Sequence, residues 1–150
     1  MLELEFAMEV RVRLGERIHI PTATHTRGTV IVQEGTFEGP RIKGIVVPQT
    51  GGDHPVIGSD GTARFDATYL LQADDGTFIF KRNYGVRSGP PDVLKRLLAK
   101  EEVDPSEYYM RLSPSFEVPP GPHDWLSKHV FIGTGRRGPE GSIFRYWMVK

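Results

Sequence analysis

Strict alternation between apolar and charged side chains at the start of the chain constrains the fold more than any other sequence feature. Seven apolar residues occupy every second position of this segment: Leu2, Leu4, Phe6, Met8, Val10, Val12 and Leu14. Charged residues fill most of the gaps: Glu3, Glu5, Glu9, Arg11 and Arg13. On an extended strand a period of two puts all apolar side chains on one face, whereas on a helix they would point in every direction. Residues 2–14 are therefore predicted to form an antiparallel strand with one buried and one solvated face.

More extended runs follow, each bounded by turn sequences. Runs rich in β-branched and aromatic residues predict strands over 27–37, 41–47, 62–73, 77–86, 107–118, 125–134 and 142–149. The pair Asp75 and Gly76 between two of these runs is a strong hairpin signal. A helix is expected to begin at Pro90 and Pro91, because proline suits the first helical turn. Four apolar residues then recur at helical spacing: Val93, Leu94, Leu97 and Leu98.

About eight short strands and one helix in 150 residues predict a single all-β domain over 1–150, either a sandwich or a barrel. The chain has no cysteine, which excludes disulfides, thiolate catalysis and iron–sulfur ligation. Nineteen basic residues balance nineteen acidic ones, so no net field attracts nucleic acid or anionic lipid. The N-terminus lacks the pattern of a signal peptide, and no stretch is long and apolar enough to span a bilayer. We therefore expect a cytoplasmic protein with no nucleic-acid or membrane partner.

Cofactor and metal motifs are weak. Residues 133–138 match the dinucleotide pattern GxGxxG, but Pro139 follows where a helix should begin, so a β-turn is predicted there. The five histidines lack zinc-ligand spacing: His19, His25, His54, His123 and His129. No GxSxG nucleophile turn occurs. We expect no cofactor and no metal.

Polar residues set among apolar ones mark the candidate site. Asp53 follows a glycine-rich loop and precedes His54, whereas Asp66 lies inside an apolar and aromatic strand that also holds Tyr69. An acid at position 66 must be exposed or paired, because burying an unpaired carboxylate is costly, and Arg111 is one candidate partner. The set also includes Phe116, Glu117 and Trp125. Either a structural ion pair with solvent-facing acids or the polar rim of a ligand cavity fits this pattern.

Several motifs resemble, in order, those of the domain of unknown function 3237 family. They are GPRIKGIVVP at 39–48, GGD at 51–53, DG at 60–61, FDATY at 65–69, DG at 75–76, YMR at 109–111, FE at 116–117 and WL at 125–126. The resemblance implies a closed, calycin-like, eight-stranded antiparallel barrel with one short α-helix, and a tendency to form homo-oligomers. In some fungal relatives, cofactor-free ring closure has been ascribed to the family.

The family's motif positions fall on five residues of this chain: Asp53, Asp66, Arg111, Glu117 and Trp125. The chain departs from the pattern at His54, Thr68 and Ser127, where the family often has Trp, Arg and Asn. An imidazole that titrates near neutral pH thus replaces an aromatic wall at position 54. The loss of an Arg at position 68 would change the partner of Asp66, and either change predicts a different substrate from that of the relatives, or none.

The resulting hypothesis is a barrel that binds a small hydrophobic or phenolic molecule, as a cofactor-free acid/base isomerase or cyclase. Asp53 or His54 would move a proton and Arg111 would hold developing negative charge. The remaining candidates would line the ligand site: Asp66, Tyr69, Phe116, Glu117 and Trp125.

Two rival classes stay open, a lipocalin-like carrier or sensor without chemistry and a structural protein whose barrel is filled by its own side chains. Convergent Asp, His and Arg groups around a void would favour the enzyme. An apolar void would favour the carrier, and a filled interior the structural protein.

Overall fold

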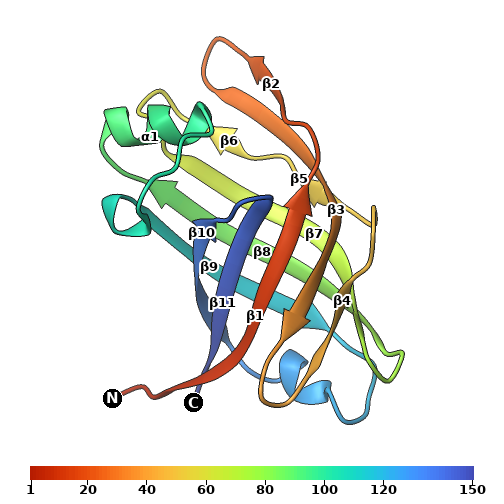
Figure 1. The fold of residues 1–150 in the computed structure, drawn as a ribbon. Coiled ribbons are helices and arrows are strands. Elements are labelled where there is room, and N and C mark those ends of the chain that lie inside the picture. The colour runs from red at the N-terminus through yellow and green to blue at the C-terminus, as the bar shows by residue number, and fades with distance from the viewer.

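The computed structural model describes residues 1–150 and contains one antiparallel sheet that closes on itself (Figure 1). Its strands are β1 (Leu4–Leu14), β2 (Ile18–Pro21), β3 (Thr26–Glu38), β4 (Lys43–Val46), β5 (Gly52–Asp53), β6 (Val56–Ile57), β7 (Ala63–Ala73), β8 (Phe78–Ser88), β9 (Tyr109–Glu117), β10 (Phe131–Arg137) and β11 (Gly141–Val149). The sheet closes because β1 pairs with β11 on one side and with β3 on the other. The short strands β4, β5 and β6 each pair with both β3 and β7, so together they fill one position of the ring. The predicted closed eight-stranded antiparallel barrel is confirmed.

The helical segments lie at the two ends of the barrel (Figure 1). The helix α1 (Pro91–Leu98) directly follows β8 and buries Val93, Leu94 and Leu97 at one end, as the spacing of its apolar residues predicts. The short 3₁₀ segment η1 (Pro105–Glu107) precedes β9, and η2 (Asp124–Ser127) lies at the opposite end. Trp125 therefore belongs to a helical turn and not to a strand, because β10 begins only at Phe131. No helix is long and apolar enough to cross a bilayer.

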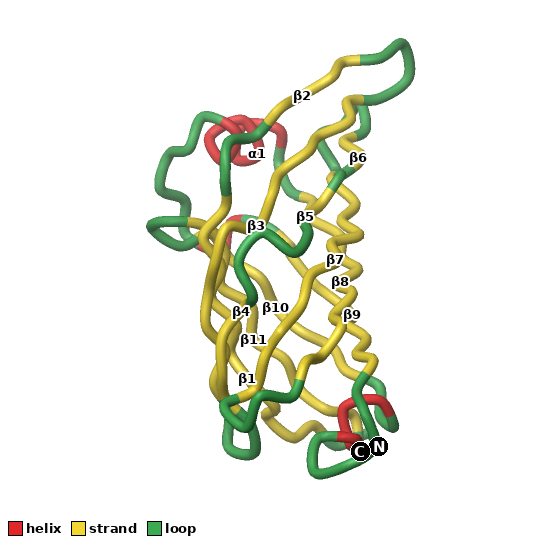
Figure 2. The backbone as a smooth tube through the Cα atoms, turned by 90° about the vertical axis from the view of Figure 1, so that its right-hand side faces the viewer, coloured by secondary structure: helices red, strands yellow, loops and turns green.

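The strand β2 stands apart from the ring. It pairs only with β3, and the two extend beyond the rest of the barrel at the end that carries α1 (Figure 2). The sequence analysis did not predict it, nor the two-residue strands β5 and β6, because such short segments carry too few residues to show a period.

The alternation predicted for β1 holds over most of its length. Val10 and Val12 are buried in the core, and Arg11 between them is exposed. A register shift between Phe6 and Met8 interrupts the pattern, since a β-bulge lets two successive residues oppose one on the partner strand. The apolar residues ahead of this bulge, such as Leu4, are consequently exposed.

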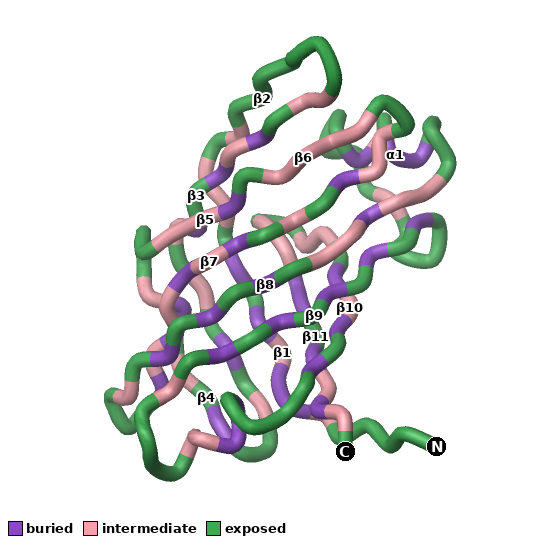
Figure 3. Tube along the Cα trace, turned by 180° about the vertical axis from the view of Figure 1, so that it is seen from behind, coloured by how far each residue is buried: buried purple, intermediate pink, exposed green.

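The strand β8 alternates between buried and exposed residues (Figure 3), and most of its buried residues are polar while most of its exposed ones are aromatic. The buried positions include Lys81, Asn83 and Arg87. The exposed ones include Phe78, Phe80 and Tyr84. Of the adjacent basic residues Lys81 and Arg82, only Arg82 is exposed, because alternation along a strand turns only one of two neighbours toward water. Polar groups on an inward strand face point to something other than a filled apolar core.

The glycines of the GxGxxG match lie mostly within strand β10 and not in a β-turn, which corrects that expectation. A Cβ at position 133 would overlap the ring of Tyr146, so Gly133 makes room for a fully buried aromatic side chain. The chain turns only after Arg137, ahead of β11. No helix begins here, so the segment does not form a dinucleotide site.

Candidate functional site

The half of the barrel next to α1 contains a cavity of about 80 Å³. A single water needs roughly 10–15 Å³ on the same measure, so the space holds several waters or part of an organic molecule. Hydrophobic residues make up 15 of the 26 that line it, and they include Leu97 and Leu98 of α1. The polar and hydroxyl-bearing lining residues are Arg17, His19, Thr29, Asp53, Tyr69, Asn83, Arg87, Tyr108, Arg136, Arg137 and Ser142.

The pairing of β7 with β8 gives the depth of each group. Arg87 pairs with Ala63 at the end next to α1, Asn83 pairs with Ala67, and Lys81 pairs with Tyr69. A strand rises about 3.3 Å per residue, so Asn83 lies roughly 13 Å deeper than Arg87 and Lys81 roughly 20 Å deeper, measured along β8. The cavity therefore has a mouth at Arg87, a middle at Asn83 and a floor at Tyr69.

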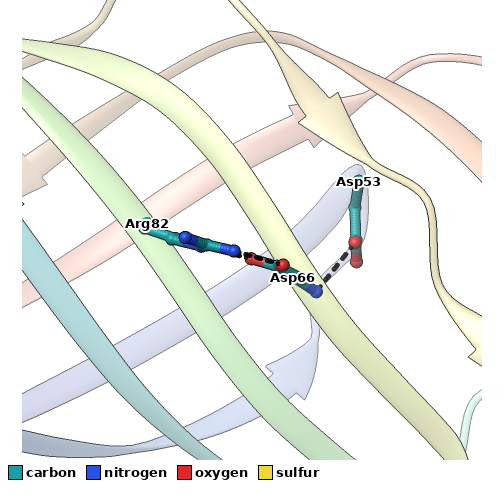
Figure 4. Close-up of polar contacts among 3 residues, drawn as sticks. All are labelled: Asp53, Asp66 and Arg82. Atoms are coloured by element: carbon teal, nitrogen blue, oxygen red, sulfur yellow. Dashed lines mark hydrogen bonds and ion pairs between the residues drawn. The ribbon is translucent and has the colours of Figure 1, made fainter.

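Asp53 is the acid of the cavity. It lies on β5, is 7% exposed and accepts a 3.0 Å hydrogen bond on Oδ1 from the backbone N–H of Asp66 (Figure 4). Burial raises the pKa of its carboxyl above 3.8, and hydrogen bonds from the backbone of Asp66 and His54 only partly oppose this. A carboxyl whose pKa is shifted toward neutrality is suited to proton transfer.

His54 lies outside the cavity, because it is the neighbour of Asp53 on an extended segment and its side chain takes the opposite direction. It is exposed, and its Nδ1 lies 2.7 Å from Oγ1 of Thr29. Arg27 donates a hydrogen bond to the His54 carbonyl. Of the two sequence-predicted proton carriers, the structure brings only Asp53 to the cavity.

Asp66 also faces outward, where Arg82 holds it in two hydrogen bonds of 2.8 Å (Figure 4). This pairing lowers the pKa of Asp66. Arg111, expected as a candidate partner, instead donates to the carbonyl of Met110 and lies over the ring of Tyr109 on the outer surface. The structure therefore places neither Asp66 nor Arg111 against the cavity.

Tyr69 forms the floor of the cavity and is hydrogen-bonded to a lysine that the sequence analysis did not select. Lys81 is fully buried, and its Nζ donates a 2.9 Å hydrogen bond to the Tyr69 hydroxyl. The same ammonium lies over three rings, at 4.6 Å from that of Tyr69, 4.9 Å from that of Tyr146 and 5.5 Å from that of Phe144. Burial lowers the pKa of Lys81 well below 10.5 and raises that of Tyr69. The sequence contained one signal for the burial of Lys81. Residues 79 and 81 lie two positions apart on a strand, so Lys81 shares a face with the buried, apolar Ile79.

The other aromatic candidates close the opposite end of the barrel. Phe116 and Trp125 both pack against Phe131, with ring centroids 5.2 and 5.9 Å apart, and Arg41 lies over the Trp125 ring. Glu117 is exposed on the last residue of β9. None of the three candidates lines the cavity.

Near Lys81 and Tyr69, two buried polar atoms have no hydrogen-bond partner in the protein. They are Oδ1 of Asn83 and the hydroxyl oxygen of Tyr146. Asn83 lines the cavity, and its side chain also acts on the Tyr146 hydroxyl, where it opposes the rise in the Tyr146 pKa that burial causes. No group of three or more His, Asp or Glu side chains is arranged to hold a metal ion.

Gly52 fixes the position of Asp53 against β3. A Cβ at position 52 would overlap the carbonyl oxygen of Val30, so only glycine allows β5 to approach β3 this closely. We expect Gly52→Ala to lower the free energy of unfolding by about 1–3 kcal/mol, as overpacking does. Urea unfolding measures this change. Gly76→Ala is not a suitable control, because Gly76 has a positive φ at which any side chain is strained. Gly58→Ala is suitable, since its nearest neighbours are ordinary contacts, and equal losses in both variants would contradict the close approach.

The fold and the cavity define the class of protein as a closed eight-stranded β-barrel with polar groups gathered inside one end. The chain belongs to the family described as "Protein of unknown function (DUF3237)", whose model matches residues 2–149. A UPF0311 protein of Rhodopseudomonas palustris is 31% identical over 137 residues, which cover 91% of this chain and 89% of that protein.

Solved structures agree with the fold. A conserved protein of unknown function from Rhodopseudomonas palustris superposes with a TM-score of 0.96 at 28% identity, covering 100% of this chain and 99% of that one. A β-barrel-like protein from Acinetobacter baumannii gives 0.86 at 30% identity, covering 100% and 97%. An enzyme from Penicillium herquei gives 0.74 at 21% identity, covering 99% and 95%, which is a likeness of fold.

Proposed function

We propose that the barrel binds a small, largely apolar molecule in its cavity and moves a proton on it without a cofactor, as an isomerase or cyclase does. The observation that carries this proposal is the buried carboxyl of Asp53 inside a mostly apolar wall, with its pKa raised by burial. Buried acids with shifted pKa values in a cavity are typical of proton-transfer sites. The charge of Asp53 also contributes to the raised pKa of Tyr69, so the two groups lie within electrostatic reach of each other.

The two groups divide the chemistry between them. Asp53 takes a proton from the ligand. When the proton comes from a carbon beside a carbonyl group, the electron pair of the broken C–H bond passes to the carbonyl oxygen; when it comes from a phenol, the pair stays on the phenol oxygen. Tyr69 donates a hydrogen bond to that oxygen. Lys81 donates a hydrogen bond to the Tyr69 hydroxyl and so holds the Tyr69 side chain in place. The neutral Asp53 then returns its proton at a second atom of the ligand. All atoms and electrons are retained, so an isomer or a ring-closed product results without an oxidant or reductant.

A carrier is the second candidate, and the apolar majority of the lining favours it. A carrier would bind the same molecules and release them unchanged. The Penicillium herquei enzyme shares the fold at low identity, so the choice between enzyme and carrier depends on the site of this chain.

Solvent-deuterium exchange tests the proposal without knowledge of the substrate. In D₂O, we expect the protein to speed the loss of carbon-bound protons from some members of a panel of enolisable ketones and phenols, followed by proton NMR. Ala67→Phe would place a ring at the depth of Asn83 and should abolish this exchange, since Ala67 lines the cavity. Binding of panel compounds without exchange would assign the barrel to the carriers. No binding by any compound would contradict both.

A further inference from the structure

Four arginines line the cavity; one of them, Arg136, is exposed, and the other three are buried or half-buried at its mouth. Arg17 lies between β1 and β2, Arg87 at the end of β8 and Arg137 at the end of β10, and all three line the cavity. Burial, together with the charges of Arg137 and Arg87, lowers the pKa of Arg17 to about 10. Burial and the charge of Arg137 also lower the pKa of Arg87. Three guanidinium groups thus repel one another at one end of a mostly apolar space.

None of these three charges has an acid within salt-bridge distance, although the charge of Asp53 acts on Arg17 from farther away. None of the three forms a salt bridge, whereas six arginines on the outer surface do: Arg11, Arg13, Arg41, Arg82, Arg96 and Arg145. The other exposed arginines also form none, but water solvates their charges. Asp53 is the one acid among the lining residues, and its carboxyl accepts a hydrogen bond from the backbone N–H of Asp66 and not from an arginine.

Arg87 shows the lack of a partner most clearly. It is 7% exposed, its Nε is buried without a hydrogen-bond partner, and its guanidinium lies 5.5 Å from the ring of Phe65. A buried charge without a counterion is unfavourable, and an anion that enters the cavity removes that cost.

We propose that the cavity takes a small molecule that carries a carboxylate, bound at its mouth by Arg87 together with Arg17 and Arg137. This inference rests on the proposed function and adds the class of ligand to it. The planar guanidinium fork matches the two oxygens of a carboxylate and forms short, charge-assisted hydrogen bonds with it. Ordinary surface arginines are exposed to water and to acids, whereas these three face an interior that holds mainly apolar side chains.

The depth of the groups fixes how such a ligand lies. Arg87 is level with Ala63, and Asp53 is level with Asp66, three residues further along β7. This spacing is roughly 10 Å along the strand. The carboxylate at the mouth therefore leaves an apolar body about the length of two fused rings to reach Asp53, with Tyr69 beyond it.

Paired probes that differ only in charge test the inference. Isothermal titration with 2-naphthoate and with its uncharged isostere 2-naphthamide gives the preference for an anion at pH 7. We expect the wild-type protein to bind the naphthoate at least about tenfold more tightly, which is typical of a charge-assisted hydrogen bond. Arg87→Met, which keeps the length and apolar contacts of the side chain, should remove most of this preference and leave the naphthamide affinity unchanged.

Two further variants make the result specific. Arg111→Met, on the outer surface, should change neither affinity. Arg17→Gln, at a half-buried position, repeats the test of Arg87 should the methionine variant fail to fold. Equal affinity of the wild-type protein for both probes would overturn the carboxylate inference and leave small-molecule binding intact. A failure to bind either probe would contradict the carboxylate inference and count against the proposed function as well.

Discussion

Replacing Asp53 by asparagine should slow proton transfer on any substrate by about 10²–10⁴-fold and leave the affinity for that substrate nearly unchanged. Asparagine has nearly the same shape, and its side-chain oxygen still accepts the hydrogen bond from the backbone N–H of Asp66. What it lacks is the ability to take up and release a proton. The deuterium-exchange rate, measured at saturating substrate, reports the loss.

The matched control is Asp66→Asn on the outer face, which should keep the wild-type exchange rate. An equal loss in both variants would show that the carboxylates act through the fold and not through chemistry.

The pH dependence has a defined sign. The rate should fall as the pH drops through the raised pKa of Asp53, above 3.8, because the protonated acid is no longer a base. Asp66, His54 and Arg17 are the charged or titratable groups that act on it. A raised pKa also means that the folded protein disfavours the ionised form, so stability decreases as the pH rises through that window. At pH 7 Asp53→Asn should therefore be at least as stable as the wild-type protein.

Replacing Lys81 by methionine should abolish a rise in stability that the wild-type protein shows with increasing pH. Burial lowers the pKa of Lys81 in the folded state, so between that lowered value and 10.5 the unfolded chain binds more protons than the folded one. The free energy of unfolding then increases with pH across this window, by at most about 1.4 kcal/mol per pH unit for one proton. Urea unfolding of both proteins from pH 7 to pH 10 measures the difference. Parallel pH profiles would show that Lys81 titrates normally.

The partner of Lys81 gives a second measurement at one pH. Tyr69→Phe leaves the buried Nζ of Lys81 without its hydrogen-bond acceptor, which should cost about 1–3 kcal/mol of stability at pH 7. Lys81→Met fills the same space without a charge, and such replacements are often neutral or stabilising. The double variant should be more stable than Tyr69→Phe alone. Additive effects would mean that the two groups do not interact.

The barrel could be predicted because its signal is local and repeated. Val10, Arg11 and Val12 alternate as a half-buried strand requires, and the Asp75–Gly76 turn joins β7 to β8 as expected. The helix was predicted from Pro91 and four apolar residues for the same reason. The prediction that the sheet closes into a barrel rested on the resemblance to a family, because the strand pattern alone was equally consistent with a sandwich.

The site was harder to predict, since inward and outward faces cannot be told apart where both carry polar residues. On β8, Phe80 and Lys81 point in opposite directions, and the usual preference of aromatic residues for the interior would choose the wrong one. Asp53 and His54 posed the same question on β5. The partner of Asp66 depends on which strand lies beside β7, and this is β8 with Arg82. Phe116 and Trp125 are aromatic and buried, but nothing in the sequence tells one end of a barrel from the other.

The pairing of β7 with β8 shows that the backbone of this barrel and the side chains inside it can vary independently. The ladder of hydrogen bonds that pairs the two strands joins main-chain groups, so it does not depend on which side chains stand at positions 83 and 87. Exchanging Asn83 or Arg87 would thus alter the chemistry of the interior while the ring itself persists. Relatives with the same architecture can in this way serve unlike molecules, and a graft of two inward positions should be enough to carry a preference from one barrel to another.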